Sequence, residues 1–296
     1  MTLAITPLDK NFDYSPDVLS RYRLIEILAL WEGRLTTKHL CKCFDIGRQQ
    51  ASKDIRIYRE EIAPHNLEYD KQLRGYKPTE HFEAVLTSGT VEDYLSLLAF
   101  NKRRSSKAVQ FHWGFDNIAM IVPPIRNVQP SMLQAVVRAI SNKQRLEIDY
   151  LSLDNPIAET RVIAPHTLVQ TPLRWHVRAY CEKNKGYRDF VLSRFSGDTH
   201  QLGVTPNLID GDEAWHMPVT VDLIANTKLN LHQRDLVELD YGMQDGHLKI
   251  PTSLALVNYV LLSLGLNVLE VDVVSEQQQI AIKNLEEIRS LLLPQG

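Results

Sequence analysis

The chain has 296 residues, of which 44% are hydrophobic and 23% are charged, as is ordinary for a soluble globular protein with two or three domains. Its formal net charge of −3 excludes a protein that is basic throughout. The sequence has no apolar run long enough to span a membrane, begins with no signal peptide pattern, and has 3 cysteines, which cannot all pair. These features predict a cytoplasmic protein without a membrane partner.

The segment from Ser20 to Lys77 is locally basic. It holds 12 Lys or Arg residues against 8 Asp or Glu residues, a balance that suits a DNA-binding module attached to other domains. Apolar residues at helical spacing predict a helix over 20–32 that ends at Gly33, and then a short helix over 37–43 that Thr36 or Thr37 could cap.

A third helix is expected over 48–62, before a proline. Its apolar residues form one narrow stripe: Ala51, Ile55, Tyr58 and Ile62. A tight turn at Gly47 joins it to the second helix, and 67–69 with 73–77 predicts a small hairpin. Together these elements predict a winged helix-turn-helix; the alternative is a generic helical bundle with a solvated face.

The polar face of the third helix and the hairpin supply the expected DNA contacts. Side chains expected to reach base edges in the major groove are Gln49, Ser52, Lys53 and Arg56. Basic side chains expected to contact phosphates are Arg48 at the helix start and Lys71, Arg74 and Lys77 in the wing.

Residues 86–130 are expected to link this module to the rest of the chain. A helix is predicted from Thr90 through Phe100, followed by a polar loop at 101–106. The proline-rich stretch 122–130 indicates a boundary. A segment of this kind, between two modules, often supplies a dimer interface.

After a helix that Ser131 is expected to cap, the hydrophobic period changes to two from Arg145 onward, which predicts strands. The strands are expected at 145–150, 159–163, 167–170, 174–181 and 187–192. Short strands at this spacing favour a small antiparallel barrel.

The strand over 174–181 is the most informative part of the sequence. Alternate side chains expected on one face are Arg174, His176, Arg178 and Tyr180, and those on the other face are Trp175, Val177, Ala179 and Cys181. A face rich in arginine suits an anion, because the planar guanidinium can bind two phosphate oxygens at once. The alternative is a solvated sheet face with ordinary ion pairs.

Residues 198–217 show no regular pattern and are expected to be irregular. Beyond them an α+β domain is expected, with helices on one face of a sheet. Its expected elements are a strand at 219–224, a helix at 229–236, a hairpin of strands at 237–241 and 247–250, a helix from Ser253 to 264, a strand at 268–273 and a helix from Ser275 to 292.

The central segment resembles the WYL family of bacterial regulators. The matching residues are Ile148-Asp149-Tyr150, Arg161 with Ala164-Pro165-His166, Leu168-Val169, the run from Arg174 to Tyr180, and the run from Arg188 to Arg194. Where the family has Trp-Tyr-Leu, the chain has Trp175-His176-Val177, which is similar to the defence-associated BrxR and CapW type repressors. The flanking segments resemble the winged helix and the WCX extension of such regulators.

The resemblance implies an α+β multidomain fold. Its domains would be a winged helix-turn-helix at 1–85, a helical linker or dimerisation segment at 86–130, a WYL domain with an Sm-like antiparallel β-barrel at 131–205, and a WCX α+β domain at 206–296. It also implies a homodimer on an inverted-repeat operator of double-stranded DNA. The implied ligand-binding residues are Tyr150, Ser152, His166, Arg174, His176, Arg188 and Arg194.

Two of these, Arg188 and Arg194, share strand parity with Phe190 and Leu192, which should be buried. A bulge or a strand end must therefore intervene if both arginines reach one pocket.

The resemblance predicts a ligand-responsive repressor that controls a phage-defence operon. A nucleotide or nucleic-acid effector bearing phosphate would release it from the operator. Alternatives are a barrel that serves as a nucleic-acid or protein-binding module, and a transcriptional activator. We expect no enzyme and no cofactor: the sequence has no nucleotide-binding or nucleophile motif, Ser152 and His166 have no apparent third partner, and Cys41 and Cys43 are too close for a usual zinc pair.

Overall fold

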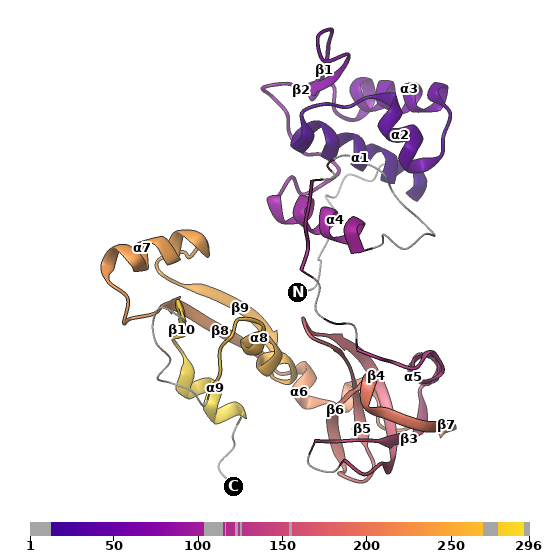
Figure 1. Ribbon diagram of the computed structural model, residues 1–296, viewed down its shortest axis with the longest axis vertical. Coiled ribbons are helices and arrows are strands. Elements are labelled where there is room, and N and C mark those ends of the chain that lie inside the picture. Colours follow the sequence, from indigo (N-terminus) through magenta and orange to yellow (C-terminus); the bar gives the residue numbers. More distant parts are fainter. Residues whose placement is uncertain are drawn as a thin grey trace. The chain divides into compact units, whose positions relative to one another are not determined.

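The computed structural model describes residues 13–103, 115, 117–121, 124, 126–153, 156–268 and 278–292. The chain divides into two compact units, Met1–Val122 and Pro123–Gly296, which Figure 1 colours along the sequence. The first unit has its own hydrophobic core, and the second unit has separate cores for its central and C-terminal domains.

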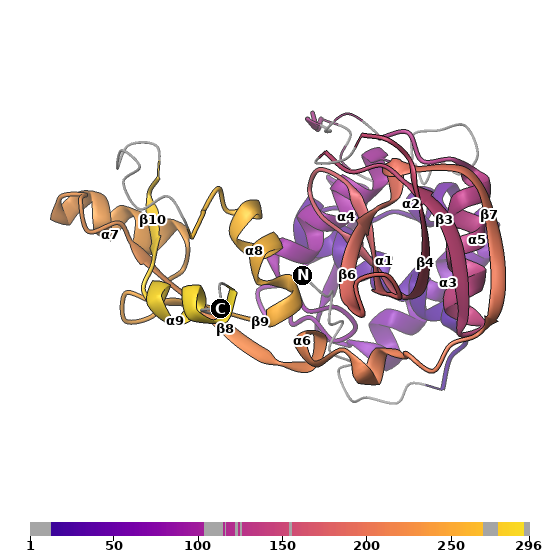
Figure 2. The same cartoon turned by 90° about the horizontal axis from the view of Figure 1, so that it is seen from below.

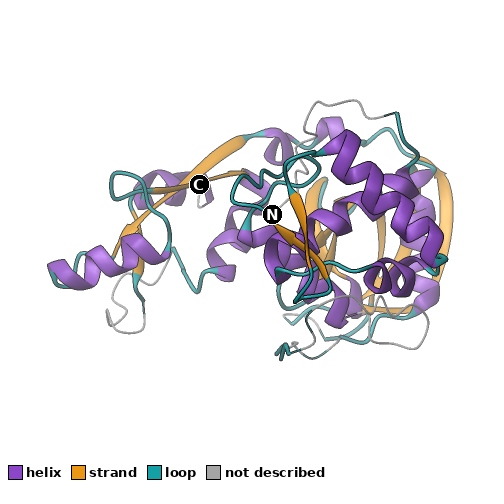
Figure 3. Cartoon of the chain, turned by 90° about the horizontal axis from the view of Figure 1, so that it is seen from above, coloured by secondary structure: helices purple, strands orange, loops and turns teal. Residues whose placement is uncertain are grey.

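The N-terminal unit is a winged helix-turn-helix and is mainly helical (Figure 3). Its elements are α1 (Pro16–Glu32), α2 (Thr37–Phe44), α3 (Arg48–Ile57) with a π-helical turn (Tyr58–Ile62), β1 (Leu67–Asp70), β2 (Gly75–Pro78) and α4 (Val91–Arg103). The apolar stripe expected on the third helix is buried in the core of this unit.

The element ends in this unit have local causes. Gly33 ends α1 with a φ of 65°, a left-handed conformation that glycine adopts without steric cost. Arg74, expected in a strand, instead lies in the turn of the wing with a φ of 48°. Helix α4 continues to Arg103, so the loop expected at 101–106 does not begin at 101.

A buried carboxylate fastens the segment after the wing to α1. Glu26 is 0% exposed and accepts hydrogen bonds from the Tyr58 hydroxyl at 2.9 Å and from the Thr87 backbone N–H at 2.8 Å. The N–H groups of Val85 and Leu86 also donate to it. A buried charge is tolerated only with such partners, so Glu26 fixes the path of the chain out of the wing.

The central domain is a curved, antiparallel five-stranded sheet with one helix against it (Figure 2). Its elements are α5 (Pro130–Ser141), β3 (Gln144–Tyr150), β4 (Glu159–Gln170), β5 (Trp175–Cys181), β6 (Gly186–Val191) and β7 (Phe195–Val204). The strand order is β6-β5-β4-β3-β7. Among the described residues the edge strands β6 and β7 do not pair, so the sheet is open and the expected closed Sm-like barrel is not confirmed.

Two features of this sheet differ from the sequence prediction. Strand β4 is continuous across the expected gap at 164–166, and a register shift between Pro165 and Thr167 accommodates the proline, which has no N–H to donate. Ser131 does not occupy the N-cap position of α5; Gln129 does, without a side-chain capping hydrogen bond, and Pro130 is at the first helical position.

The prediction that 198–217 is irregular was wrong for its first part, which belongs to β7. Gly197 and Gly203 interrupt the strand pattern there. Gly197 has a φ of 68° where β7 meets a register shift in β3, and a Cβ at this position would lie 2.8 Å from the Asp149 carboxylate. The left-handed backbone conformation at this irregular point of the strand pair, rather than a tight turn, favours glycine here.

The two faces of β5 separate as their alternation predicts. Val177, Ala179 and Cys181 pack in the core with α5, while His176 and Arg178 lie on the opposite face. This second face is nevertheless covered, since His176 and Arg178 are each only 7% exposed. It is therefore not the solvated face that the alternative interpretation required.

The C-terminal domain is a three-stranded antiparallel sheet with helices, as expected for α+β structure. Its elements are α6 (Glu213–His216), β8 (Pro218–Ala225), α7 (Leu231–Asp240), β9 (Leu248–Ser253), α8 (Val257–Ser263), β10 (Ile280–Ile282) and α9 (Leu285–Leu292). The strand order is β10-β8-β9.

The prediction of a hairpin between 237–241 and 247–250 was wrong. Val237 and its neighbours continue α7, which begins with reciprocal hydrogen bonds between Asn230 and Gln233 at 3.0 Å. Strand β9 pairs instead with β8, where Leu248 lies opposite Leu223.

Other C-terminal predictions fall partly outside the described residues. The strand expected over 268–273 and the cap at Ser275 lie mainly there, while 280–282, expected to be helical, forms β10. Within the ranges that the structure covers, every helix is too short or too polar to traverse a bilayer.

Candidate nucleic-acid interface and ligand site

Helix α3 presents one polar face to solvent. Five side chains predicted to contact DNA are exposed on this helix: Arg48, Gln49, Ser52, Lys53 and Arg56. Ala51 and Ile55, between them in the sequence, pack into the core. The arrangement has the form of a recognition helix whose outer face is free to enter a major groove.

A buried carboxylate sets the rotation of α3 against α1. Asp54 is 1% exposed, and it accepts a hydrogen bond from Arg21 Nε at 2.7 Å and one from Gln50 Nε2 at 2.8 Å. Because these bonds hold the inner side of α3, they determine which of its side chains face outward.

Among the described residues, Arg56 is the one predicted base contact that forms an ion pair. Its Nη1 atom lies 2.9 Å from Glu60 Oε2, one helical turn away, and both side chains are 55% exposed. An exposed pair of this spacing contributes little free energy, so Arg56 can exchange Glu60 for DNA.

The basic residues of the wing are not equivalent. Lys77 Nζ lies 3.1 Å from Glu68 and 3.5 Å from Asp70, and the hydrogen bond that Lys77 donates to the Glu68 carboxylate raises the pKa of Lys77. Lys71 and Arg74 are exposed at the tip and have no carboxylate partner in the part of the chain that the structure describes. The tip therefore carries the free positive charge.

Sequence reasoning missed how the tip is held. Arg34 Nε, from the segment after α1, donates to the Leu73 carbonyl at 2.7 Å. Leu35 and Tyr76 form a bridge beside it. These contacts fix the wing on the helical body.

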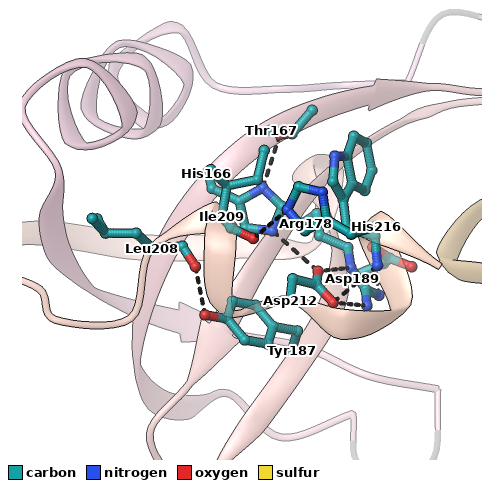
Figure 4. A network of polar contacts seen from close by, with 10 residues as sticks. His166, Thr167, Arg178, Tyr187, Asp189, Leu208, Ile209, Asp212 and His216 are labelled. Atoms are coloured by element: carbon teal, nitrogen blue, oxygen red, sulfur yellow. Dashed lines mark hydrogen bonds and ion pairs between the residues drawn. The ribbon is translucent and has the colours of Figure 1, made fainter.

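In the central domain, the Asp212 carboxylate gathers a buried polar network (Figure 4). Arg178 binds it through two hydrogen bonds, from Nε to Oδ2 at 2.7 Å and from Nη2 to Oδ1 at 3.0 Å. Arg178 also lies 3.4 Å from Asp189. Burial acts to lower the pKa of Arg178, but the two carboxylates raise it above its ordinary value, so this guanidinium is a fully charged structural group.

His166, predicted as a ligand residue, belongs to the same network. Its Nε2 lies 3.3 Å from Asp212 Oδ2 and its Nδ1 lies 2.8 Å from Thr167 Oγ1. Burial lowers the pKa of His166, although Asp212 acts in the opposite direction. Trp215 and Tyr187 pack edge-on against the ring, so His166 is enclosed by protein groups.

The remaining predicted ligand residues do not form one cradle. Tyr150, Ser152 and Arg188 line a cavity of about 220 Å³ beside β6, which we call the polar pocket. Arg174 and His176 line another of about 380 Å³, between the β4–β5 turn and α8, which we call the junction pocket. The strand end at Val191 intervenes before Arg194, and this arginine lines neither pocket.

The polar pocket is closed by groups that sequence reasoning had not assigned to the site. Its further lining residues are Glu159, Arg161, Asn184, Asp189 and Phe190. Arg161 is occupied, because it donates at 2.7 Å to both Glu159 and Asn184. Arg188 is exposed and has no carboxylate partner among the described residues, so it is the available cation of this pocket.

Tyr150 is held rigidly at the base of the polar pocket. Its hydroxyl accepts a hydrogen bond from the Val191 N–H at 3.1 Å, and its ring packs edge-on against Phe190 and Phe195. The hydroxyl oxygen keeps its own proton to donate.

The junction pocket brings the C-terminal domain to the end of β5. Its lining residues are Thr171, Pro172, Leu173, Arg174, His176, Tyr259, Leu262 and Ser263. The rings of His176 and Tyr259 lie 4.9 Å apart. Burial lowers the pKa of His176, and the nearby Arg174 and Arg194 lower it further while Asp189 acts to raise it, so the imidazole is neutral at pH 7.

Three family models match the chain in order. They describe the BrxR transcriptional regulator winged helix-turn-helix domain at residues 17–100, the WYL domain at 131–198, and the BrxR transcriptional regulator C-terminal dimerization domain at 218–288. Two of the three are domains of a transcriptional regulator, in agreement with the expectation that the chain is no enzyme.

Three curated relatives, each named DNA-binding transcriptional repressor CapW, match nearly the whole chain. The relative from Escherichia coli (strain KTE188) is 33% identical over 277 residues, which cover 92% of this chain and 91% of that protein. The Pseudomonas aeruginosa relative is 35% identical over 273 residues, with the same coverage. The Stenotrophomonas maltophilia relative is 32% identical over 270 residues, covering 91% and 90%.

A solved structure, proteasome accessory factor B/C (PafBC) of Arthrobacter aurescens, is 14% identical with a TM-score of 0.30. This chain spans 46% of its length, and the match covers 93% of this chain. A likeness this weak carries no argument about the fold.

The buried pair of Arg178 and Asp212 predicts a large loss of stability when one partner is removed. Asp212→Asn leaves the Arg178 guanidinium without its carboxylate, and we expect the second unit to lose about 3–5 kcal/mol of unfolding free energy. Differential scanning calorimetry of the full chain measures the loss as a lowered Tm. Asp210→Asn, an exposed change two residues away, is the control and should leave the Tm unchanged; equal melting of both variants would contradict the assignment.

Proposed function

This chain belongs to the BrxR and CapW family of WYL-domain transcriptional repressors, and from that premise we propose that it is a DNA-binding repressor whose operator affinity is controlled by a ligand. The observation that carries the proposal is the outward face of α3, where Gln49, Ser52, Lys53 and Arg56 are exposed together. Guanidinium and amide groups can make bidentate contacts with guanine and adenine edges in the major groove.

The repressor acts as a homodimer on an inverted-repeat operator of double-stranded DNA. The match of residues 218–288 to a dimerization domain supports a C-terminal dimer contact. Paired recognition helices related by a two-fold axis read two half-sites of opposite orientation. Arg48 and the wing contact phosphates on either side of the groove and supply affinity rather than sequence choice.

The effector occupies the polar pocket and bears phosphate. Arg188 is the available guanidinium there, and the fixed Tyr150 hydroxyl is a second donor. Guanidinium binds phosphate through two parallel hydrogen bonds. The ligand must bind the released form of the dimer more tightly than the operator-bound form, because equal affinity for both shifts no equilibrium. The operon it controls would be one of phage defence, and a nucleotide or a short nucleic-acid fragment fits the chemistry.

In a second candidate function, the central domain is a nucleic-acid-binding module, and nucleic acid bound there does not change the affinity of the protein for its operator. The exposed Arg188 and the open sheet edge at β6 favour it. Titration of the operator complex with nucleotides and short oligonucleotides separates the two: release supports the sensor, and binding without release supports the module. Activation in place of repression would depend on where the operator lies relative to the promoter.

We expect Lys53→Ala and Arg56→Ala each to weaken operator binding strongly while the dimer stays folded, because each removes a groove contact worth about 1–3 kcal/mol from both half-sites. Gel shifts with the promoter fragment measure the affinity, and light scattering verifies the dimer. Lys249→Ala, an exposed lysine of β9, controls for loss of charge alone and should bind normally. Unchanged gel shifts for both α3 variants would refute the assigned interface.

The ion pairs of the wing predict unequal salt effects. Lys71→Ala should reduce the slope of log Kd against log salt by about one for each wing that contacts DNA. The change removes an unpaired ammonium group that would otherwise neutralise one DNA phosphate. Lys77→Ala should reduce it less, since Glu68 and Asp70 already hold this ammonium group. Fluorescence anisotropy across a salt series measures both slopes; a larger effect at Lys77 would contradict this ranking.

Arg188→Met should keep full operator affinity and lose the response to the phosphate-bearing effector. The change removes the free guanidinium of the polar pocket but leaves the paired Arg161 in place. Operator release is measured by titrating the complex with the effector identified by mass analysis of the purified protein. A variant that responds as the parent protein does would place the effector elsewhere.

A further inference from the structure

We propose that the junction pocket is a second ligand site, separate from the polar pocket, and that it binds a small organic anion with an apolar or aromatic body. This site does not depend on the effector proposed for the polar pocket. It is built by the β4–β5 turn of the central domain and by α8 of the C-terminal domain, so its ligand contacts both domains of the second unit.

The balance of charge around the pocket favours an anion. Arg174 and Arg194 both act on His176, and neither guanidinium has a hydrogen-bond or ion-pair partner in the described part of the chain. Asp189, the carboxylate that acts on His176, already pairs with Arg178 at 3.4 Å. An uncompensated guanidinium that lines a cavity is a site for a carboxylate or phosphate group.

A buried and unsatisfied nitrogen gives the pocket a second polar anchor. His176 is only 7% exposed, and its Nδ1 atom has no hydrogen-bond partner. Buried polar atoms in folded proteins are nearly always paired, so such an orphan calls for a partner supplied from outside the chain. Because the ring is neutral, Nδ1 can either donate to an anion or accept from a hydroxyl or amide.

The apolar lining residues of the junction pocket favour a ligand with an apolar or aromatic body. Pro172, the Tyr259 ring and two leucines provide apolar surface, and Leu173 and Leu262 are 58% and 67% exposed at the rim. Covering these leucines removes apolar area from water, which a bare inorganic anion cannot do. A cavity of about 380 Å³ lies at the small end of the range for ligand pockets, so one ring with one anionic group fits.

Hydrogen bonds within the β4–β5 turn fix the backbone that carries Arg174. The Thr171 N–H and hydroxyl both donate to the Arg174 carbonyl at 2.9 Å, and the Arg174 N–H approaches the Thr171 hydroxyl at 3.3 Å. The guanidinium therefore extends from a backbone that needs no rearrangement on binding, which reduces the entropic cost of association.

Isothermal titration calorimetry of the full chain tests the site with phenyl phosphate and benzoate as probes. We expect saturable binding of at least one probe, about tenfold or more tighter than that of inorganic phosphate or phenol, because only the probes engage the arginine and the apolar wall together. The better probe identifies the anionic group as phosphate or carboxylate. No binding of either probe at millimolar concentration, or equal binding of inorganic phosphate, would overturn the proposal.

Two variants locate the binding. Arg174→Met should weaken the better probe about tenfold or more, and Leu262→Glu, at a position that is 67% exposed, should do the same by placing a carboxylate at the mouth. Lys249→Met, at an exposed position that lines neither pocket, should leave probe affinity within about twofold, and Arg188→Met tests whether the probes bind in the polar pocket instead. If Arg188→Met abolishes binding while Arg174→Met does not, the probes occupy the polar pocket and the second site is refuted, whereas the effector proposal stands or falls on operator release alone.

Discussion

The second unit depends on one buried ion pair, between Arg178 on β5 and Asp212 in the segment that leads to β8. Removing two charges from water is costly, and the cost is offset here by two hydrogen bonds within the pair and by further bonds from His166 and the Trp215 N–H to the same carboxylate. Asp212 thereby also caps α6. The pair holds the start of the C-terminal domain against the central sheet, which is what allows α8 to close the junction pocket.

Compensation of charge divides the basic residues into structural and available groups. Arg21, Arg161 and Arg178 each bind a carboxylate at short range and position an element. Arg174 and Arg188 have no such partner within the described ranges, and each lines a cavity. The arginine face expected on β5 is therefore real but not uniform. Arg178, in the middle of this face, stabilises the fold, while Arg174 and His176 line the junction pocket.

The elements that sequence periodicity predicted correctly are those whose environment is local. The stripe of α3 and the wing follow from spacings of a few residues, and the two faces of β5 follow from strict alternation. Polar face, turn and hairpin lie next to one another in the chain, so the candidate DNA contacts could be identified without knowing any distant contact.

The rest could not be predicted because distant segments decide it. Asp212 lies in a stretch without pattern, and only the fold brings it to Arg178, 34 residues away. Val237 and its neighbours alternate as a strand would, yet the capped start of α7 carries the helix through them. Five of the seven ligand residues drawn from the family pattern separate into two pockets, one of them walled by Tyr259 of the C-terminal domain, while His166 and Arg194 line neither pocket.

Asp189 is the point at which the two pockets meet. It lines the polar pocket and contacts Arg178 at 3.4 Å, and it acts electrostatically on His176 and Tyr259, which line the junction pocket. An anion that enters the polar pocket repels this carboxylate and competes for the positive charge that holds it. The two states of the dimer can differ in ligand affinity only through contacts that change between them, and the contact of His176 with Tyr259, beside Asp189, joins the sheet to α8 of the C-terminal domain.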